Sequence, residues 1–403
     1  MPRLPRSLYA LCFAVFVAYM GGGMVGTVRV LFVRHQGGSL GIISAMTAAF
    51  LVANFVCQYP WGWLSDRWGR RTVLVIGLVL QSVVGFLYIT VNDPVLFVVL
   101  RVFEGAAAAS SLPVARAAIA DMVPDELRGR AYGIFAAFLN MGFLFGPAAG
   151  GLLAVVGYAW VFVIAGILRF AGAAGVLLAL GSMPVRPIPT EAETGMPAAR
   201  ARDLLNFGLV AAYVIAFGDY LWLGFEMTLA PLWMRHHLGA TLPLIGLTYS
   251  AWALPNAIMS PIGGRLADRH RRWVLILVGG LSQIPMYLMY AFAGSIYPVM
   301  AGFAVQATLY AVISPAVDAH VAHASPAALR GRVQSVYSAV GTVGAFAGAT
   351  VFVPLYAISF RLPLIALATG YAVLVMVGGL MVRAWSLRTP AGTRVPAGLS
   401  HTA

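Results

Sequence analysis

The sequence predicts an all-α integral membrane protein with twelve transmembrane helices, arranged as two pseudo-symmetric bundles of six. Three observations lead to this prediction. Of the 403 residues, 61% are hydrophobic and only 10% are charged, and the mean hydropathy is +0.86, so the polar surface is too small to cover a water-soluble globule. Most apolar runs reach about 20 residues, the length of a membrane-crossing helix, whereas a barrel strand needs ~10 alternating residues. In addition, motifs of the first half of the chain recur in the second.

Polar breaks divide the apolar runs into twelve expected spans. These are residues 7–33, 39–61, 72–91, 95–120, 130–156, 159–182, 205–234, 242–263, 273–293, 296–322, 331–357 and 363–386. No water reaches the bilayer core to satisfy backbone groups, so each span has to be a helix. The first span follows Arg3 and Arg6 without a small-residue cleavage site before a soluble domain. We therefore interpret it as a retained helix and not as a signal peptide.

Basic residues gather on one side of the predicted bundle. All 26 are arginine, and nineteen lie at the chain ends or in segments on the side of the termini. The other side has only Arg34, Arg235 and Arg361. The positive-inside rule then places both termini in the cytoplasm, which requires an even number of spans. The formal net charge of +13 follows from this topology, and without a dense basic patch we expect no nucleic-acid partner.

The chain divides almost evenly into two halves. Residues 183–204 break the apolar pattern with Pro, Gly and most of the loop acids, which is typical of a linker. We predict an N-terminal six-helix bundle over 1–182, a cytoplasmic linker over 183–204, a C-terminal bundle over 205–388 and a cytoplasmic tail over 389–403. The expected location is the cell inner (plasma) membrane, as a multi-pass protein.

An internal repeat supports this division. The segment GWLSDRWGRR at 62–71 recurs as GRLADRHRRW at 264–273, an offset of 202 residues. The segment PDELRGR at 124–130 recurs as PAALRGR at 326–332, at the same offset. Duplicated halves with six spans each share one orientation, so they should be related by an axis along the membrane normal.

Three motifs in the first half resemble those of a known family. The loop Gly-Trp-Leu-Ser-Asp-Arg-Trp-Gly-Arg-Arg at 62–71 is similar to the major facilitator superfamily signature between its second and third helices. The fourth span carries Arg101-Val-Phe-Glu104-Gly and ends at Asp121, resembling a second motif in which Gln more often stands at 104. Residues 142–151 resemble the motif of proton-driven antiporters. The chain thus resembles this superfamily over essentially its whole length, and most of all its twelve-helix drug/proton antiporters.

The resemblance implies gating at the cytoplasmic loops. In the family, an Asp such as Asp66 with an Arg partner such as Arg70 and an acid such as Asp121 latches the outward-facing state. The loop motif has a physical basis, because its Gly-rich turn lets two helices approach closely and Asp66 can face the positive end of a helix dipole. In the motif at 142–151, Pro147 leaves a backbone carbonyl without its helical hydrogen bond. Alternatively, the charged loop residues merely follow the positive-inside rule, and the glycines of 142–151 serve helix packing without a role in transport direction. The expected gating residues are Gly62, Asp66, Arg67, Gly69, Arg70, Asp121, Asp268, Gly146 and Pro147.

The second half departs from these motifs. His270 and Arg271 stand where the first half has Trp and Gly69. Gly348-Ala349 stands where the first half has Gly-Pro, so the proline motif is not repeated. We therefore do not expect these motifs to act in both halves.

Eight charged residues fall inside the predicted spans, where each costs ~2.5–3.5 kcal/mol on insertion scales and is rarely present without use. They are Arg29, Arg101, Glu104, Arg116, Arg169, Asp219, Glu226 and Asp318. In the fold that the resemblance implies, the first, fourth, seventh and tenth helices line the central cavity, and seven of the eight lie on them. We expect a structural role for Arg169, which lies on the sixth.

Spacing within the helices sharpens this expectation. Asp219 and Glu226 are seven residues apart, a difference in direction of ~20°, so they share one face. Paired carboxylates in low dielectric suit a proton carrier, and we predict proton coupling at Asp219, Glu226 and Glu104. The repeat offset pairs Arg116 with Asp318, which suggests a polarised cavity. The residues expected to line the substrate cavity are Arg29, Arg101, Arg116, Asp318, Asn140, Trp222, Trp252 and Asn256.

Alternatives remain for these residues. Arg29 and Arg101 could instead snorkel to the outer interface, Arg116 and Asp318 could form a structural ion pair, and the aromatic residues could serve ordinary packing. Cys12 and Cys57 show no metal-ligand spacing.

The leading functional prediction is a secondary active transporter that works by alternating access, exchanging protons for a small amphipathic or cationic compound. A symporter or facilitator for a sugar, organic acid or lipid-like solute is the alternative, with Arg29 and Arg116 as anion partners. A membrane enzyme is disfavoured because no catalytic motif occurs in a suitable context, a channel because no filter sequence repeats, and a receptor because no soluble ligand domain is present. We expect no cofactor and no metal. The expected partners are a small-molecule substrate, protons and the lipid bilayer, with the chain as a monomer.

Overall fold

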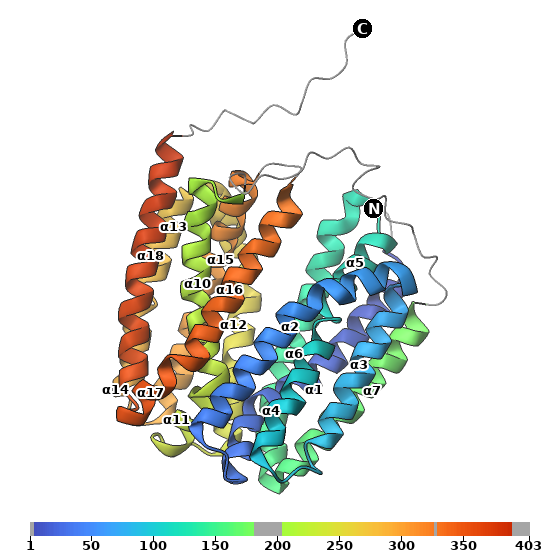
Figure 1. The fold of residues 1–403 in the computed structure, drawn as a ribbon. Helices are drawn as coiled ribbons and strands as arrows, with labels where there is room; N and C mark the ends of the chain where they lie inside the picture. Colours follow the sequence, from blue (N-terminus) through green and yellow to red (C-terminus); the bar gives the residue numbers. More distant parts are fainter. Residues whose placement is uncertain (1–3, 181–203, 326–328, 389–403) are drawn as a thin grey trace.

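The protein is all-helical across the residues that a computed structural model describes, namely 4–180, 204–325 and 329–388 (Figure 1). The N half contains α1 (Arg6–His35), α2 (Leu40–Trp68), α3 (Arg70–Leu87), α4 (Pro94–Ala108), α5 (Leu112–Met122), α6 (Asp125–Val156) and α7 (Tyr158–Ala179). The C half contains α10 (Phe207–Thr228), α11 (Ala230–His236), α12 (Leu242–Arg269), α13 (Arg272–Leu281), α14 (Ile284–Phe292), α15 (Ile296–Ala324), α16 (Arg330–Thr350), α17 (Phe352–Ile358) and α18 (Leu362–Arg388). The predicted fold class is confirmed. The predicted linker, apart from its last residue, and the predicted tail lie outside the described residues, so the domain boundaries stay predictions.

Local chemistry explains several helix ends. Ser39 and Asn206 accept hydrogen bonds from the backbone N–H groups of the first turns of α2 and α10. Asp93 does the same for α4, with Pro94 at the first helical position, where a missing N–H costs nothing. The sharp turn between α2 and α3 uses Gly69, whose φ of 86° favours glycine.

Eleven helical segments among the described residues are long and apolar enough to cross a membrane. Three of them are discontinuous spans, because α4 with α5, α13 with α14, and α16 with α17 each form one crossing. They match eleven of the twelve predicted spans.

The one predicted span without a match among these eleven is residues 242–263, which lies in α12. Thr248, Ser250 and Asn256 interrupt its apolar run, and Ser250 accepts a hydrogen bond from the backbone N–H of Ala148 on α6 at 3.1 Å. At ~1.5 Å per residue its 28 residues exceed the thickness of a bilayer core, and it lies between α6 and α15. These polar side chains are buried within the bundle, and twelve spans remain our prediction.

The two halves stand side by side, with the start of α1 and the end of α18 at one end of the bundle (Figure 1). We call this the Arg-rich end, because α1 begins there at Arg6, α2 ends beside Arg67, and α12 and α18 end at Arg269 and Arg388. The ribbons of the halves diverge toward this end (Figure 1). The short helices α11 and α17 mark the opposite end (Figure 1).

The halves touch mainly through α6 with α12 and α2 with α16. Ser44 on α2 donates a hydrogen bond to the carbonyl of Ala349 on α16 at 2.8 Å. A Cβ added to Gly246 on α12 would lie 2.3 Å from the carbonyl oxygen of Pro147 on α6, and one added to Gly151 would lie 2.4 Å from the carbonyl oxygen of Leu242. The two backbones are therefore in direct contact, which only small residues permit.

Glycines also set the packing inside each half. A Cβ on Gly146 would lie 2.5 Å from the carbonyl oxygen of Met20 on α1, and one on Gly150 would lie 2.4 Å from that of Met24. In the C half, Gly344 and Gly348 approach the α10 backbone in the same way. The predicted close packing of the glycine face is present, while its role in transport direction stays a prediction.

The α6–α12 contact yields a test. Gly151→Ala should lower the free energy of unfolding of the detergent-purified protein by about 1–3 kcal/mol, and with it the melting temperature, because the new methyl group overpacks a backbone contact. Gly133→Ala on the same helix is the matched control, since nothing lies within 4 Å of its added Cβ, and it should be neutral or stabilising because alanine favours helix. Equal melting temperatures for the two variants would contradict the direct contact.

Candidate functional site

Glu104 lies at the centre of a buried cluster of three arginines in the N half. Its carboxylate binds Arg29 of α1 at 2.9 Å, Arg101 of α4 at 3.0 Å and Arg169 of α7 at 3.3 Å, and all four side chains are at most 9% exposed. The hydroxyl of Tyr88, which follows α3, donates to the same carboxylate at 3.3 Å. One acid therefore ties together four spans of the N half.

This cluster carries two more positive than negative charges. Burial of an unpaired ion costs several kcal/mol, so the remaining donors need partners. Arg169 donates to the backbone carbonyl of Gln81 at 3.2 Å, and the guanidinium of Arg101 lies 3.9 Å from the centre of the Phe50 ring. A carbonyl and an aromatic face both stabilise a cation without adding a charge. The cluster thus suits a permanent structural joint.

The cluster answers two questions that the sequence left open. Arg29 and Arg101 do not snorkel to the interface, because both are buried and bonded to Glu104. Arg169, for which the sequence indicated no partner, binds the same carboxylate, in agreement with the structural role expected for it. Substrate contact by Arg29 and Arg101 and proton coupling by Glu104 stay untested predictions.

Asp219 has a different environment, in the middle of α10. Its carboxylate accepts a hydrogen bond from the hydroxyl of Tyr371 on α18 at 2.9 Å. No arginine in the described part of the chain forms an ion pair with it or with Glu226. This acid is therefore held by a neutral donor and not by a cation.

Glu226 follows two turns later on α10. The Trp222 side chain acts on the Glu226 carboxylate, and the backbone carbonyl of Glu226 accepts a hydrogen bond from Tyr249 at 2.9 Å. Tyr287 lies within electrostatic range of both Asp219 and Glu226. This agrees with the prediction that the two acids share one face of the helix.

Aromatic and acidic side chains gather on the inner side of the C half. Asp219 and Asp318 both act electrostatically on Tyr220, Tyr310 and Tyr337. Trp252 on α12 packs against Tyr310, with ring centroids 5.8 Å apart. We call this set the acidic wall; its members are Asp219, Asp318, Tyr220, Tyr310, Tyr337 and Trp252. Tyr337 was not predicted as a site residue, because a tyrosine in an apolar helix has neither a charge nor a motif that indicates a function.

Arg116 faces the acidic wall from the N half. It is exposed on α5, and its charge acts on Asp318 and Tyr220. The two charged side chains are within electrostatic range without forming an ion pair in the described residues. The polarised arrangement suggested by the repeat offset is therefore present across the two halves.

The other predicted cavity residues lie elsewhere. Trp222 is buried in the C half, with its ring centroid 5.2 Å from that of Tyr287. Asn256 is buried on α12, where Ser260 donates to its backbone carbonyl at 2.7 Å. Asn140 is half-buried on α6. The structure thus places Trp222 among packed aromatic rings, and substrate contact by these three residues stays a prediction.

The predicted gating motif is assembled at the Arg-rich end. Arg70 binds the carboxylates of Asp66 and Asp121, the latter at 3.2 Å, and donates to the hydroxyl of Ser65 at 2.5 Å. These contacts join the adjoining ends of α2, α3 and α5. The guanidinium of Arg67 lies 3.9 Å from the centre of the Trp63 ring. A latching function of these contacts stays a prediction.

For Gly62 and Asp268, two further predicted gating residues, the structure gives less support. A Cβ added to Gly62 would meet nothing within 4 Å, so no neighbour requires a glycine there in this conformation. Asp268 is exposed at the end of α12.

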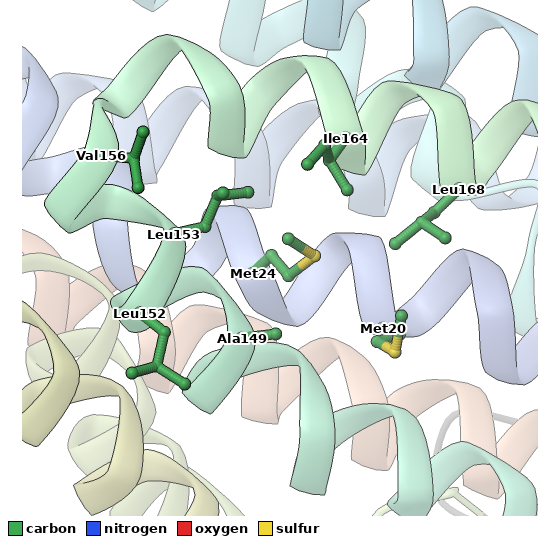
Figure 2. Close-up of a pocket in the computed structure, with 8 residues that line it drawn as sticks. All are labelled: Met20, Met24, Ala149, Leu152, Leu153, Val156, Ile164 and Leu168. Carbon is green, nitrogen blue, oxygen red and sulfur yellow. The ribbon is translucent and has the colours of Figure 1, made fainter.

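An apolar cavity lies apart from all these groups. Figure 2 shows side chains from α1, α6 and α7 around it, among them Met20, Leu152 and Leu168. It holds about 470 Å³, and all eight lining residues are apolar. Leu152 and Val156 are also largely exposed. This cavity offers no group that could hold a polar solute and fits hydrocarbon.

The arginine cluster yields a second test. Glu104→Gln removes the only anion and leaves three buried cations, which should destabilise the protein by about 3–5 kcal/mol. The measurement is thermal unfolding in detergent, with Glu226→Gln as the matched control because Glu226 has no arginine partner to lose among the described residues. A Glu104→Gln protein as stable as the control would show that the cluster does not hold the N half together.

Comparison with known proteins gives a consistent result. A family model for the Major Facilitator Superfamily matches residues 11–227 and 209–401. Quinolone resistance protein NorA from Staphylococcus aureus is 28% identical over 189 residues, 47% of this chain and 47% of NorA, so the match spans about half of that relative. Multidrug resistance protein 1 from Bacillus subtilis is 28% identical over 273 residues, 68% of this chain and 69% of the relative.

A solved structure also shares the fold. A bacterial homolog of the human lysosomal transporter Spinster, in an inward-facing and unoccupied conformation, superposes with a TM-score of 0.77 at 17% identity, covering 96% of this chain and 98% of that one. The family indicates a transporter rather than an enzyme. The apolar helices and the bacterial relatives agree with the predicted location, as a multi-pass protein of the inner membrane. The chain belongs to the major facilitator superfamily.

Proposed function

We propose that the protein exports a small amphipathic or cationic compound in exchange for protons, by alternating access of a site between its halves. The observation that carries this proposal is the contrast between the buried acids. Glu104 is bound by three arginines, so its charge is held permanently. Asp219 is bound by a tyrosine hydroxyl, so it is free to exchange a proton. The names of the two bacterial relatives, which refer to drug resistance, support export.

The acidic wall suits a cationic, partly apolar solute. Aromatic faces attract cations and bind apolar groups, and a nearby carboxylate supplies the opposite charge. Asp219 and Asp318 lie among Tyr220, Tyr310 and Tyr337, which combines both features. The buried arginines of the spans are engaged by Glu104; they are Arg29, Arg101 and Arg169. This leaves little to favour the alternative of an anionic substrate, apart from Arg116.

Coupling then follows from competition at the acids. A protonated Asp219 is neutral and gives up its attraction for a cation, so proton binding and substrate binding exclude each other. In this conformation the halves touch through α6 with α12 and diverge toward the Arg-rich end (Figure 1). We take this end as cytoplasmic, because it carries the arginines, and the conformation as open to the cytoplasm. One chain suffices, since the site lies between its own halves.

The proposal is tested in proteoliposomes with an imposed pH gradient and a fluorescent lipophilic cation as probe. Asp219→Asn and Glu226→Gln should each lower gradient-driven transport by roughly tenfold or more, because each removes a proton site. Asp93→Asn is the matched control: it makes the same chemical change at an exposed residue outside the bundle, and Asn still caps α4.

Three outcomes would overturn it. Transport that ignores the gradient in wild type and in Asp219→Asn alike would exclude proton coupling through Asp219. Equal loss in Asp93→Asn would show that the effect is not specific to buried acids. Gradient-driven uptake of a neutral sugar, without transport of the cation, would favour a symporter.

A further inference from the structure

The repeat offset pairs four polar residues of the N half with four of the C half. Adding 202 to the positions of Gln81, Tyr88, Glu104 and Arg169 leads to Gln283, Tyr290, Gln306 and Tyr371. The first set belongs to or contacts the arginine cluster. We call the second set the C-half node. Two of the four positions keep their residue type, and the two charged residues are replaced by neutral ones.

The C-half node is a hydrogen-bonded unit inside the C half. Tyr290 of α14 donates to the side-chain oxygen of Gln306 on α15 at 3.0 Å. The amide of Gln306 donates to the side-chain oxygen of Gln283 at 3.4 Å and to the hydroxyl of Tyr287 at 3.2 Å. The amide of Gln283 donates to the hydroxyl of Tyr371 at 3.0 Å. All these side chains are buried.

The chain of donors ends on Asp219. Tyr371 accepts from Gln283 and donates to the carboxylate of Asp219. Successive hydrogen bonds that point the same way polarise one another, so the last donor is strengthened by those behind it. The node thus stabilises the charged form of Asp219 without a cation, whereas the N half has an arginine, Arg169, at the position equivalent to Tyr371.

Gln283 also lies at a break in the helix. The ninth predicted span is divided between α13, which ends at Leu281, and α14, which begins at Ile284. Its counterpart Gln81 lies within the continuous helix α3. A broken helix has fewer backbone hydrogen bonds to hold it straight, so it yields more easily. The hydrogen bonds therefore connect Asp219 to one of the helix breaks of the C half.

Two acids lie near Asp219, namely Glu226 on the same face of α10 and Asp318 in the acidic wall. The other titratable groups that act with it in the described residues are tyrosines, from its own helix and from four others. They are Tyr220 of α10, Tyr287 of α14, Tyr310 of α15, Tyr337 of α16 and Tyr371 of α18. Tyr371 is the one whose hydroxyl bonds the carboxylate among the described residues. The hydrogen-bond chain is therefore the main polar connection of this acid to the protein around it.

We propose that Tyr371, Gln283 and Gln306 are positioning residues for proton coupling, which hold Asp219 ionised for substrate and transmit its protonation to the α13–α14 break. A neutral carboxyl attracts the Tyr371 hydroxyl less strongly than a carboxylate does. Proton uptake thus weakens the tie between α10 and α18 and relaxes the donors behind it. This inference rests on the proposed proton coupling at Asp219.

The test compares Tyr371→Phe with Tyr297→Phe in the proteoliposome assay over a range of pH. Tyr297 is exposed on α15 at 63%, so its hydroxyl should not matter. Tyr371→Phe should keep its melting temperature close to that of wild type and still transport. Its pH midpoint of transport should move by about half to one pH unit toward higher pH, the size expected for one lost hydrogen bond to a carboxylate.

A second variant keeps the inference falsifiable should Tyr371→Phe fold poorly. Gln283→Leu leaves Tyr371 in place and removes the donor behind it, so it should move the pH midpoint the same way by a smaller amount. A wild-type pH profile in a folded Tyr371→Phe or Gln283→Leu protein would overturn the inference. Asp219→Asn separates this inference from the proposed function. If it abolishes proton coupling while Tyr371→Phe and Gln283→Leu behave like wild type, only the inference fails. If Asp219→Asn itself keeps proton coupling, the proposed function fails, and the inference with it.

Discussion

An ionised carboxylate inside a membrane bundle has to be compensated, and the way in which this is done divides the molecule into two parts. In the N half, Glu104 is compensated by Arg29, Arg101 and Arg169, which come from three different helices. Removal of Glu104 would leave three buried cations without their anion, which is costly enough to make this joint permanent. In the C half, Asp219 depends on a neutral tyrosine. Under the proposed function, only the second kind of acid gains and loses a proton during transport.

The duplication has therefore diverged in chemistry while it has kept its geometry. Both halves pack their first and fifth spans through glycines, with Gly146 against α1 and Gly348 against α10. Both place a polar group at the same positions in the core. The N half has charged residues, Glu104 and Arg169, at two of them, whereas the C half has only amides and hydroxyls, which lead to Asp219. Under the proposed function, the N half acts as a rigid frame and the C half as the part that responds to protons.

Much of this could be predicted from the sequence. Length, hydropathy and the arginine distribution indicated the helices and the two halves, and the resemblance indicated the contacts of Arg70 with Asp66 and Asp121. The arginine cluster could not be predicted, because Arg29 and Glu104 are 75 residues apart and only the packing of α1 against its neighbours brings them together. The C-half node was missed because Gln283, Gln306 and Tyr371 are uncharged and a search for buried charges passes over them. The repeat offset, applied to Glu104 and Arg169, would have found two of its members.

The central claim is that the acids of the C half exchange protons while Glu104 stays ionised. Infrared difference spectroscopy of the protein in lipid, recorded as the pH is changed, observes this directly, since a protonated carboxyl group absorbs apart from a carboxylate. We predict a carboxyl band that disappears as the pH rises, that is diminished in Asp219→Asn and in Glu226→Gln, and that is absent when both are replaced. A band of full strength in the doubly substituted protein would assign the exchangeable proton to another acid and would contradict the account.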